Sequence, residues 1–268
     1  IQDGKYVYVR GLSDRYMKVT LNGAEIPGLD PNFNTVQMDL FPSNVVENIL
    51  VQKTYSPDKP SFIGGLVDVG TRTFPEKFSL KFSASTGFNT NTHFHEDFLV
   101  YEGGDLDYLG NDDGARDIPD LVKGVELPPG ISSNAEELYK YSSTFNKIWD
   151  TRKTKAILDQ SYSLSVGGQT TLFGKPVGLL GAVSYKRDSE YYENGRLDEY
   201  DAISESTVTA QNRLAEDKGT ESVIWSTLLS GNLKVNTNNR ISVNYLRNQN
   251  GQQNARFMEG STTRSDNY

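Results

Sequence analysis

The stretch FSLKFSASTGF, residues 78–88, alternates apolar or small uncharged residues with polar or small ones. Successive side chains of a β-strand point to opposite faces, so this stretch predicts a strand with one apolar and one polar face. Its length matches the ~9–11 tilted residues with which a transmembrane β-strand crosses a bilayer. The strand alone leaves open whether protein or lipid covers its apolar face.

The composition fits a β-rich protein. The chain has 268 residues, with 15 Tyr, 12 Phe, 24 Gly and no Cys, so it forms neither disulfides nor thiolate metal sites. No run approaches the ~18 apolar residues of a membrane-spanning helix, although transmembrane strands would leave the same weak hydropathy signal. The net charge of −8 argues against nucleic acid as a partner. The chain opens at Ile1 without a signal peptide, so we expect further residues upstream.

The first part of the chain, residues 1–75, is expected to form a small α/β domain. Asn22-Gly23 supplies the positive φ angles of a tight hairpin turn. Pro42-Ser43 is typical of a helix start, with Ser43 or Asn44 as the N-cap of a short helix that continues to Ile49. Short extended segments are predicted over 6–10, 17–21, 24–26, 50–53 and 66–71.

Residues 76–268 are expected to form longer strands. After 78–88, alternating patterns predict strands over 162–172, 177–185, 223–235 and 241–245. The connections are expected to alternate between long (89–160, 188–221 and beyond 248) and short (174–176 and 236–239). Such alternation is typical of a transmembrane barrel, whereas a soluble β-sandwich has no reason to show it. A soluble β-sandwich binding module therefore stays as a lesser alternative.

A small α/β unit followed directly by long amphipathic strands resembles the junction between plug and barrel in TonB-dependent outer-membrane receptors. The order and spacing of four segments carry the resemblance: the Arg-Gly motif in 9–12, the hairpin over 19–26 with its Asn-Gly turn, the helix-to-strand segment 41–53, and the Gly-Gly strand 64–72. The variant resembles the Bacteroidetes branch of the family, on the segments 14–16, 39–43, 53–58, 101–104 and 111–116. Thr54 and Gly70 depart from the family pattern.

The resemblance implies a fold and a function. The fold would be a transmembrane antiparallel β-barrel, with about five of its ~22 strands in 76–268, preceded by the plug domain in 1–75. Five strands cannot close a barrel, so we expect the sequence to belong to a longer polypeptide. The function would be import of a nutrient ligand across the outer membrane of a Gram-negative bacterium, with no enzymatic reaction.

Partners and site residues follow from the same resemblance. Outer-membrane lipid would cover the barrel, an extracellular ligand would bind the loops, and the TonB energy-coupling complex would act through a segment upstream of this sequence. A lipoprotein lid is a further partner that the family would allow. No catalytic residue, cofactor or metal site is assigned. The candidates for plug structure or gating are Arg10, Gly11, Gly64, Gly65 and Arg72.

Other interpretations remain beside this one. A barrel with a permanently seated plug would instead be a structural or accessory component of an envelope complex. His93 and His95 are more readily loop residues than metal ligands, because two ligands do not make a site. The acidic run from Asp105 to Asp113 fails the spacing of a calcium-binding EF-hand loop. The remaining carboxylates show no acid and base pair at catalytic spacing.

Overall fold

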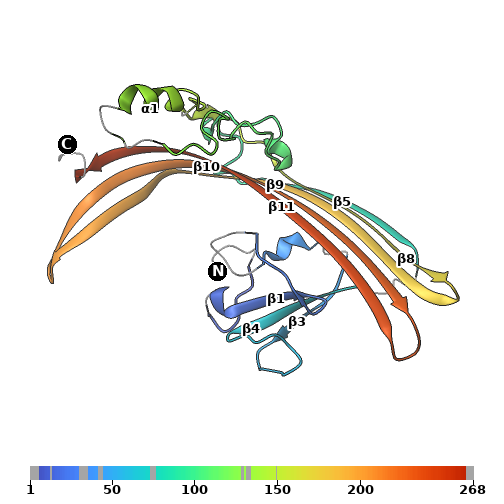
Figure 1. Cartoon of the computed structure of the whole chain (residues 1–268). Coiled ribbons are helices and arrows are strands. Elements are labelled where there is room, and N and C mark those ends of the chain that lie inside the picture. Colours follow the sequence, from blue (N-terminus) through green and yellow to red (C-terminus); the bar gives the residue numbers. More distant parts are fainter. Residues whose placement is uncertain are drawn as a thin grey trace. The chain divides into compact units, whose positions relative to one another are not determined.

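The computed structural model describes residues 6–12, 14–29, 36–41, 45–72, 77–127, 130, 134–148 and 150–263. The described chain is mostly antiparallel β-sheet (Figure 1). None of its helices is long and apolar enough to span a membrane. Contacts divide the chain into two compact units, the first formed by 1–87, 159–188 and 222–250, and the second by 88–158, 189–221 and 251–268.

The first unit contains a four-stranded sheet in the order β2-β1-β4-β3. Its strands are β1 (Met17–Leu21), β2 (Ala24–Glu25), β3 (Val46–Gln52) and β4 (Gly65–Thr71). β1 and β4 are parallel, while the other two pairs are antiparallel. The first unit also contains the 3-10 helices η1 (Asp14–Tyr16) and η2 (Met38–Leu40).

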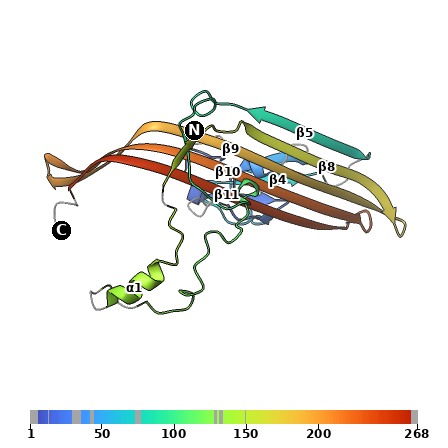
Figure 2. The same ribbon diagram turned by 90° about the horizontal axis from the view of Figure 1, so that it is seen from above.

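The larger sheet has the strand order β11-β10-β9-β8-β5, as Figures 1 and 2 show. Its strands are β5 (Ser79–Gly87), β8 (Asp159–Leu172), β9 (Lys175–Ser204), β10 (Thr207–Lys234) and β11 (Arg240–Thr262). β9, β10 and β11 each contribute residues to both units. The second unit also holds β6 (Phe98–Val100), η3 (Asp107–Leu109), α1 (Ala135–Ser142) and β7 (Arg152–Thr154).

Several predicted elements are confirmed. β1 and β4 lie where short extended segments were predicted, and β5 lies where alternation predicted a strand. Asn22 and Gly23 have the expected positive φ angles of 52° and 84°. Two short turns, at 173–174 and near 236–239, join the long strands. The first falls one residue earlier than predicted, because Phe173 and Gly174 adopt the positive φ angles of a two-residue hairpin turn.

Two predictions in the first part of the chain are wrong. Residues 6–10 form no strand, because Arg10 and Gly11 turn the chain with φ angles of 60° and 66°. The helix predicted to reach Ile49 is absent from the described residues, and its proposed start at Pro42, Ser43 and Asn44 lies outside them. From Val46 the chain is instead strand β3, which pairs with β4 and so satisfies its backbone in the sheet rather than in a helix.

The expected long connection over 188–221 is also wrong. β9 runs for 30 residues to Ser204, and a turn at 205–206 leads directly into β10. Tyr, Leu, Ile and Val are interspersed among the charged residues of this stretch, and pairing between β9 and β10 satisfies its backbone. β11 likewise continues to Thr262, beyond the predicted end of its strand. Long and short connections therefore do not alternate strictly along the chain.

Candidate functional site

The larger sheet presents an exposed apolar face within the first unit. Register pairs Phe82 with Leu164 and Leu164 with Val183, so side chains of one face form continuous rows across β5, β8 and β9. We define the apolar face as the following exposed side chains: Leu80, Phe82, Leu164, Val166, Leu172, Leu179, Val183, Leu229, Ile241, Val243 and Tyr245. Such a continuous exposed apolar surface is typical of a site covered by another molecule.

An aromatic cluster lies at one end of this face. Tyr162 and Tyr185 face each other across β8 and β9, with ring centroids 6.2 Å apart and nearly parallel planes. Trp225 on β10 continues the row, with its ring centroid 4.9 Å from that of Tyr185. From this cluster the apolar rows continue along the strands as far as Leu172, which pairs with Lys175 at the hairpin turn. The apolar face thus has an aromatic border at one end and short turns at the other.

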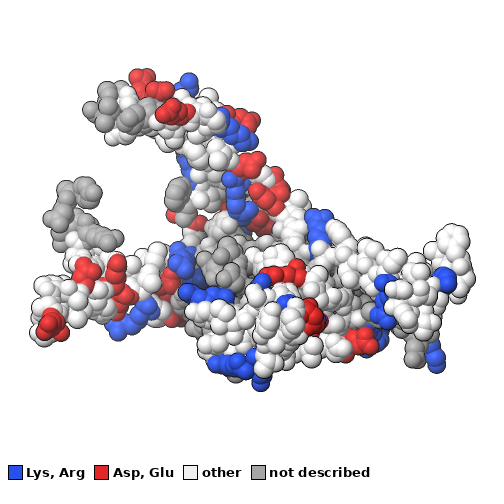
Figure 3. All heavy atoms as spheres, turned by 60° about the horizontal axis from the view of Figure 1, so that its bottom comes forward, with Lys and Arg blue, Asp and Glu red and all other residues white. Residues whose placement is uncertain are grey.

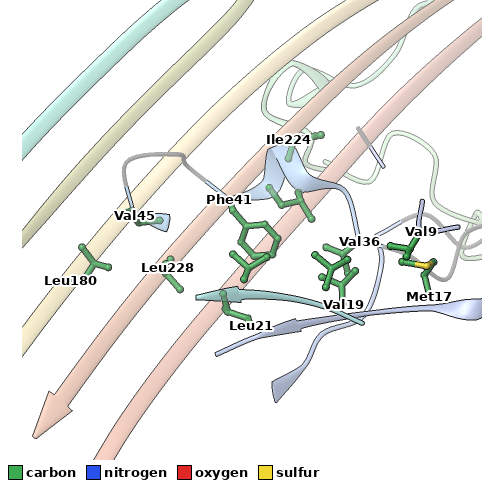
Figure 4. Packing of buried hydrophobic residues seen from close by; sticks show 14 residues of the cluster. Val9, Met17, Val19, Leu21, Val36, Phe41, Val45, Leu180, Ile224 and Leu228 are labelled. Carbon is green, nitrogen blue, oxygen red and sulfur yellow. The ribbon is translucent and has the colours of Figure 1, made fainter. Parts of the chain in front are cut away.

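The opposite face of the larger sheet packs on the four-stranded sheet. Figure 4 shows Leu180 and Leu228 of the larger sheet pointing toward Phe41, Val45 and Leu21. All of these side chains are buried in one hydrophobic cluster, which also contains Ala182 and Ile224 of the larger sheet. These side chains of both sheets belong to the first unit, and the shared core joins the two sheets there.

Polar side chains flank this core on β10 and β11. The Ser230 hydroxyl donates to Asn244 Oδ1 at 2.8 Å, and the Ser226 hydroxyl donates to Asn248 Oδ1 at 2.7 Å. The Ser242 hydroxyl donates to Asn232 Oδ1 at 2.7 Å. These three bonds cross between facing residues of the two strands, so they fix the register while satisfying buried polar groups. This ladder was not predicted from the sequence, although Ser and Asn at alternate positions of both strands are a signal for it.

Acidic and basic residues are distributed unevenly along the chain. Figure 3 shows the charged side chains on one face of the molecule. The segments 77–87, 159–188 and 222–250, which form the larger sheet in the first unit, contain only two acidic residues, Asp159 and Asp188. They contain eight basic residues: Lys77, Lys81, Lys175, Lys186, Arg187, Lys234, Arg240 and Arg247. This part of the sheet is therefore positively charged in a protein whose net charge is −8.

The predicted gating candidates lie around the four-stranded sheet. The Gly64 N–H donates to the Tyr16 carbonyl at 2.8 Å, and Gly65 opens β4 so close to Val9 that a Cβ would lie 2.9 Å from the Val9 Cβ. Arg10 and Gly11 form the turn just after Val9. The sequence motifs at 9–12 and 64–65 are thus brought together by packing.

Arg72 stands apart from these residues, directly after β4, where its N–H donates to the Val45 carbonyl at 3.1 Å. The side chains of Arg10 and Arg72 are exposed. Within the described residues neither of them forms an ion pair with a carboxylate. Their role in gating stays a prediction.

Contact with a neighbouring side chain explains why position 70 is a glycine. It pairs with Asn48 of β3, and a Cβ on Gly70 would lie 2.3 Å from Asn48 Oδ1. A side chain at position 70 would therefore displace the Asn48 amide.

The acidic run in the second unit is organised around one arginine. Arg116 binds both carboxylate oxygens of Asp107, with Nη1 at 2.8 Å from Oδ1, and its guanidinium lies 5.4 Å from the centre of the Tyr101 ring. This ion pair holds the pKa of Asp107 below its usual range and raises the pKa of Arg116. Asp113 accepts hydrogen bonds from the N–H groups of Asp105 and Ala115 instead. The carboxylates thus hold the segment together.

The two histidines do not share an environment. His93 is fully buried and accepts a hydrogen bond at Nδ1 from the Asn89 N–H at 2.8 Å. His95 is exposed, with Nε2 at 2.6 Å from the Thr90 carbonyl. In the described part of the chain, no three His, Asp or Glu side chains are grouped as metal ligands.

The segment 88–158 packs closely on β10 and β11 within the second unit. A Cβ on Gly219 would lie 2.1 Å from the Leu99 carbonyl oxygen, and one on Gly251 would lie 2.6 Å from the Gly110 Cα. Backbone therefore passes directly over backbone at both glycines. In addition, the Gln253 amide donates to the Tyr101 carbonyl at 2.9 Å. The first part of this segment is thus anchored, whereas α1 has no buried residue.

Two tyrosines of β9 lie in an acidic part of the second unit. Tyr192 donates its hydroxyl to the buried Glu216, whose Oε1 is 3.3 Å from Arg256 Nε. Burial, together with the negative charges of Glu193, Asp217 and Asp97, raises the pKa of the neighbouring Tyr191 to about 12. Sequence reasoning did not find this cluster, because it treated the stretch as a loop.

Comparisons with protein-family models, with curated proteins and with solved structures each gave no match.

Proposed function

We propose that the protein is a TonB-dependent outer-membrane receptor of the Bacteroidetes type, which imports a nutrient ligand through a plugged β-barrel. The observation that carries this proposal is the pair of unlike faces on the larger sheet. One face is apolar and exposed, as lipid requires, while the other bears hydroxyl, amide and basic side chains and packs on a small separate sheet. The family resemblance of the sequence supplies the import function.

The dimensions of the apolar face support a place in a bilayer. From the aromatic cluster at Tyr162 to Leu172 the strand advances ten residues. At a rise of ~3.3 Å per residue and a tilt of ~40°, this distance covers about 25 Å of membrane thickness, the height of the apolar band of transmembrane barrels. Tyr162, Tyr185 and Trp225 would then form part of the interfacial aromatic girdle.

The parts of the long strands beyond the aromatic cluster would stand outside the bilayer. β9 continues from Tyr185 to Ser204, through a stretch rich in Asp, Glu and Arg that lipid would not tolerate. The acidic segment 88–158 belongs to the same compact unit as this hairpin. Together they would provide the extracellular surface that captures the ligand.

The four-stranded sheet would act as the plug. Import through it needs no reaction chemistry, only a ligand-dependent bias between a closed and an open arrangement of this sheet. In the family, the energy for that rearrangement comes from the proton-motive force through the TonB complex. Arg10, Gly11, Gly64, Gly65 and Arg72 are the residues of this sheet and its turns that we propose for plug structure or gating.

One observation favours the alternative of a permanently seated plug in an envelope complex. The small sheet and the wall share a hydrophobic core through Leu180, Ile224 and Leu228. Separating these surfaces would expose apolar side chains at a cost of about 25 cal/mol per Å². An importer would have to offset this free-energy cost each time the small sheet moves away from the wall. In an accessory barrel the same cost would keep the plug seated.

Ligand uptake distinguishes the two functions. Uptake of a broad nutrient panel is compared between cells with and without the gene, each with and without an uncoupler that collapses the proton-motive force. Gene-dependent uptake that the uncoupler abolishes is expected for the importer. Unchanged uptake across the panel, with the protein present in the outer membrane, would contradict import and support the accessory role.

A further inference from the structure

Two positive charges lie directly opposite each other on β10 and β11 in the second unit. Side-chain hydrogen bonds show the same antiparallel register along these strands, at Ser230–Asn244, Ser226–Asn248, Thr220–Asn254 and Gln211–Thr263. In this register Lys218 is opposite Arg256. Directly opposite residues have Cβ atoms about 5 Å apart, so like charges at such positions are destabilising. A local conflict of this kind is expected at functional sites.

A buried carboxylate orients Arg256 at this position. Glu216 is 5% exposed, and its Oε1 lies 3.3 Å from Arg256 Nε, while its other carboxylate oxygen accepts the Tyr192 hydroxyl. Because the contact with Glu216 uses Nε, the two Nη groups of Arg256 remain as hydrogen-bond donors. Within the described residues, neither Lys218 nor Arg256 forms an ion pair with any other carboxylate. Of these two positive charges, the described chain therefore compensates only one.

An amide and an aromatic ring adjoin this pair of cations. Asn254 lies two residues before Arg256 on β11, which places it on the same face about 7 Å away. Its Oδ1 accepts a hydrogen bond from Thr220 Oγ1 at 2.9 Å, so its N–H groups remain as donors. The Tyr192 ring, whose hydroxyl binds Glu216, is 43% exposed. The site thus combines oriented donors with an exposed aromatic surface.

We infer that Lys218, Asn254 and Arg256 bind a carboxylate group of a ligand whose apolar part lies on the Tyr192 ring. As a site of ligand capture for import, it rests on the proposed function. The arginine fork matches the planar geometry of a carboxylate. One uncompensated positive charge suits the single charge of a carboxylate better than the nearly double charge of a phosphate, which Glu190, two residues before Tyr192, would also repel.

The test uses the full-length protein purified in a neutral detergent, with benzoate as the probe and benzamide as its uncharged counterpart. Isothermal titration calorimetry is expected to show at least a tenfold higher affinity for benzoate. Lys218→Gln should lower the benzoate affinity about tenfold, as for the loss of one charged hydrogen bond, and leave benzamide binding unchanged. The Tm of the empty variant should not fall, because the substitution removes one of two opposed positive charges.

Arg213→Gln is the matched control, because it removes a positive charge from the opposite face of the same strand, five residues from Lys218. Equal affinity for benzoate and benzamide, or an equal loss in Arg213→Gln, would overturn the inference. A lower Tm of Lys218→Gln with weaker binding of both probes would show a structural role instead and overturn it as well. Tighter binding of phenyl phosphate than of benzoate would overturn the assignment to a carboxylate.

The site and the proposed function can fail separately. Nutrient uptake that depends on the gene and on the proton-motive force, in a protein that does not bind benzoate, would refute this site alone. Benzoate binding that Lys218→Gln weakens, in a protein that imports no nutrient, would support the site and contradict the importer.

Discussion

Replacing Leu80 by Lys tests whether lipid covers the apolar face. Leu80 pairs with Val166, which lies between the aromatic cluster and the hairpin turn and therefore near the middle of the proposed membrane band. A lysine at that depth costs about 2–4 kcal/mol in a transmembrane barrel. The ratio of assembled to unassembled protein should then fall by roughly 30-fold to several hundredfold.

The assay is the amount of protein in the outer-membrane fraction at matched total expression. Ser83→Lys is the control, since it introduces the same charge on the same strand but on the opposite face, where Ser83 pairs with Ser163. This control variant should assemble normally. Outside a membrane Leu80 is 63% exposed, and an exposed substitution changes stability by no more than about 0.5 kcal/mol. Normal assembly of Leu80→Lys would therefore refute a lipid-covered face.

Three further predictions follow from the buried and ionised groups. Leu228→Ala should destabilise the unit by about 2–5 kcal/mol in denaturant unfolding, because Leu228 is 1% exposed in the shared core; a loss below 1 kcal/mol would contradict that packing. Since folding lowers the pKa of Asp107, its ion pair with Arg116 stabilises the protein above the unfolded pKa of about 3.9 and is lost as the pH falls through the lower folded pKa. Hydrogen exchange around 104–116 should accelerate across that range, and Arg116→Gln should remove the acid dependence. For Tyr191, burial favours the neutral phenol, so its stabilisation is complete below pH 10 and lost toward pH 12. Tyrosinate absorbance should show a component near pH 12 that is missing in Tyr191→Phe.

Local patterns predicted the strands well where one face is buried or apolar. β5 follows directly from alternation, β4 follows from an extended segment after Gly64-Gly65, and the Asn22-Gly23 turn follows from the left-handed conformation that these residues tolerate. The helix predicted to reach Ile49 failed because pairing with β4 outweighed a local helix-start signal.

The extension of β9 through its charged residues failed for a different reason. Charged side chains usually indicate a loop, but most of those in 188–221 are exposed, and the buried Glu216 is bound by Tyr192 and Arg256, so the strands continue through them. The candidate site, too, could be predicted only in part from the sequence. The motifs at 9–12 and 64–65 were recognised separately in the sequence, and only the structure brings them together, with Gly65 against Val9. Which exposed side chains form one apolar face depends on the register of neighbouring strands, which no single segment encodes.

The two glycines under the segment 88–158 have a consequence for how this protein can change over time. At Gly219 and Gly251 any side chain would collide with the backbone above it, so these positions are closed to substitution. The exposed stretch that carries α1 meets no such restriction, because none of the helix is buried. Sequence drift, and the insertion of a tag or a foreign epitope, should therefore be confined to 134–148 and its surroundings, while the anchored base of the segment stays constant.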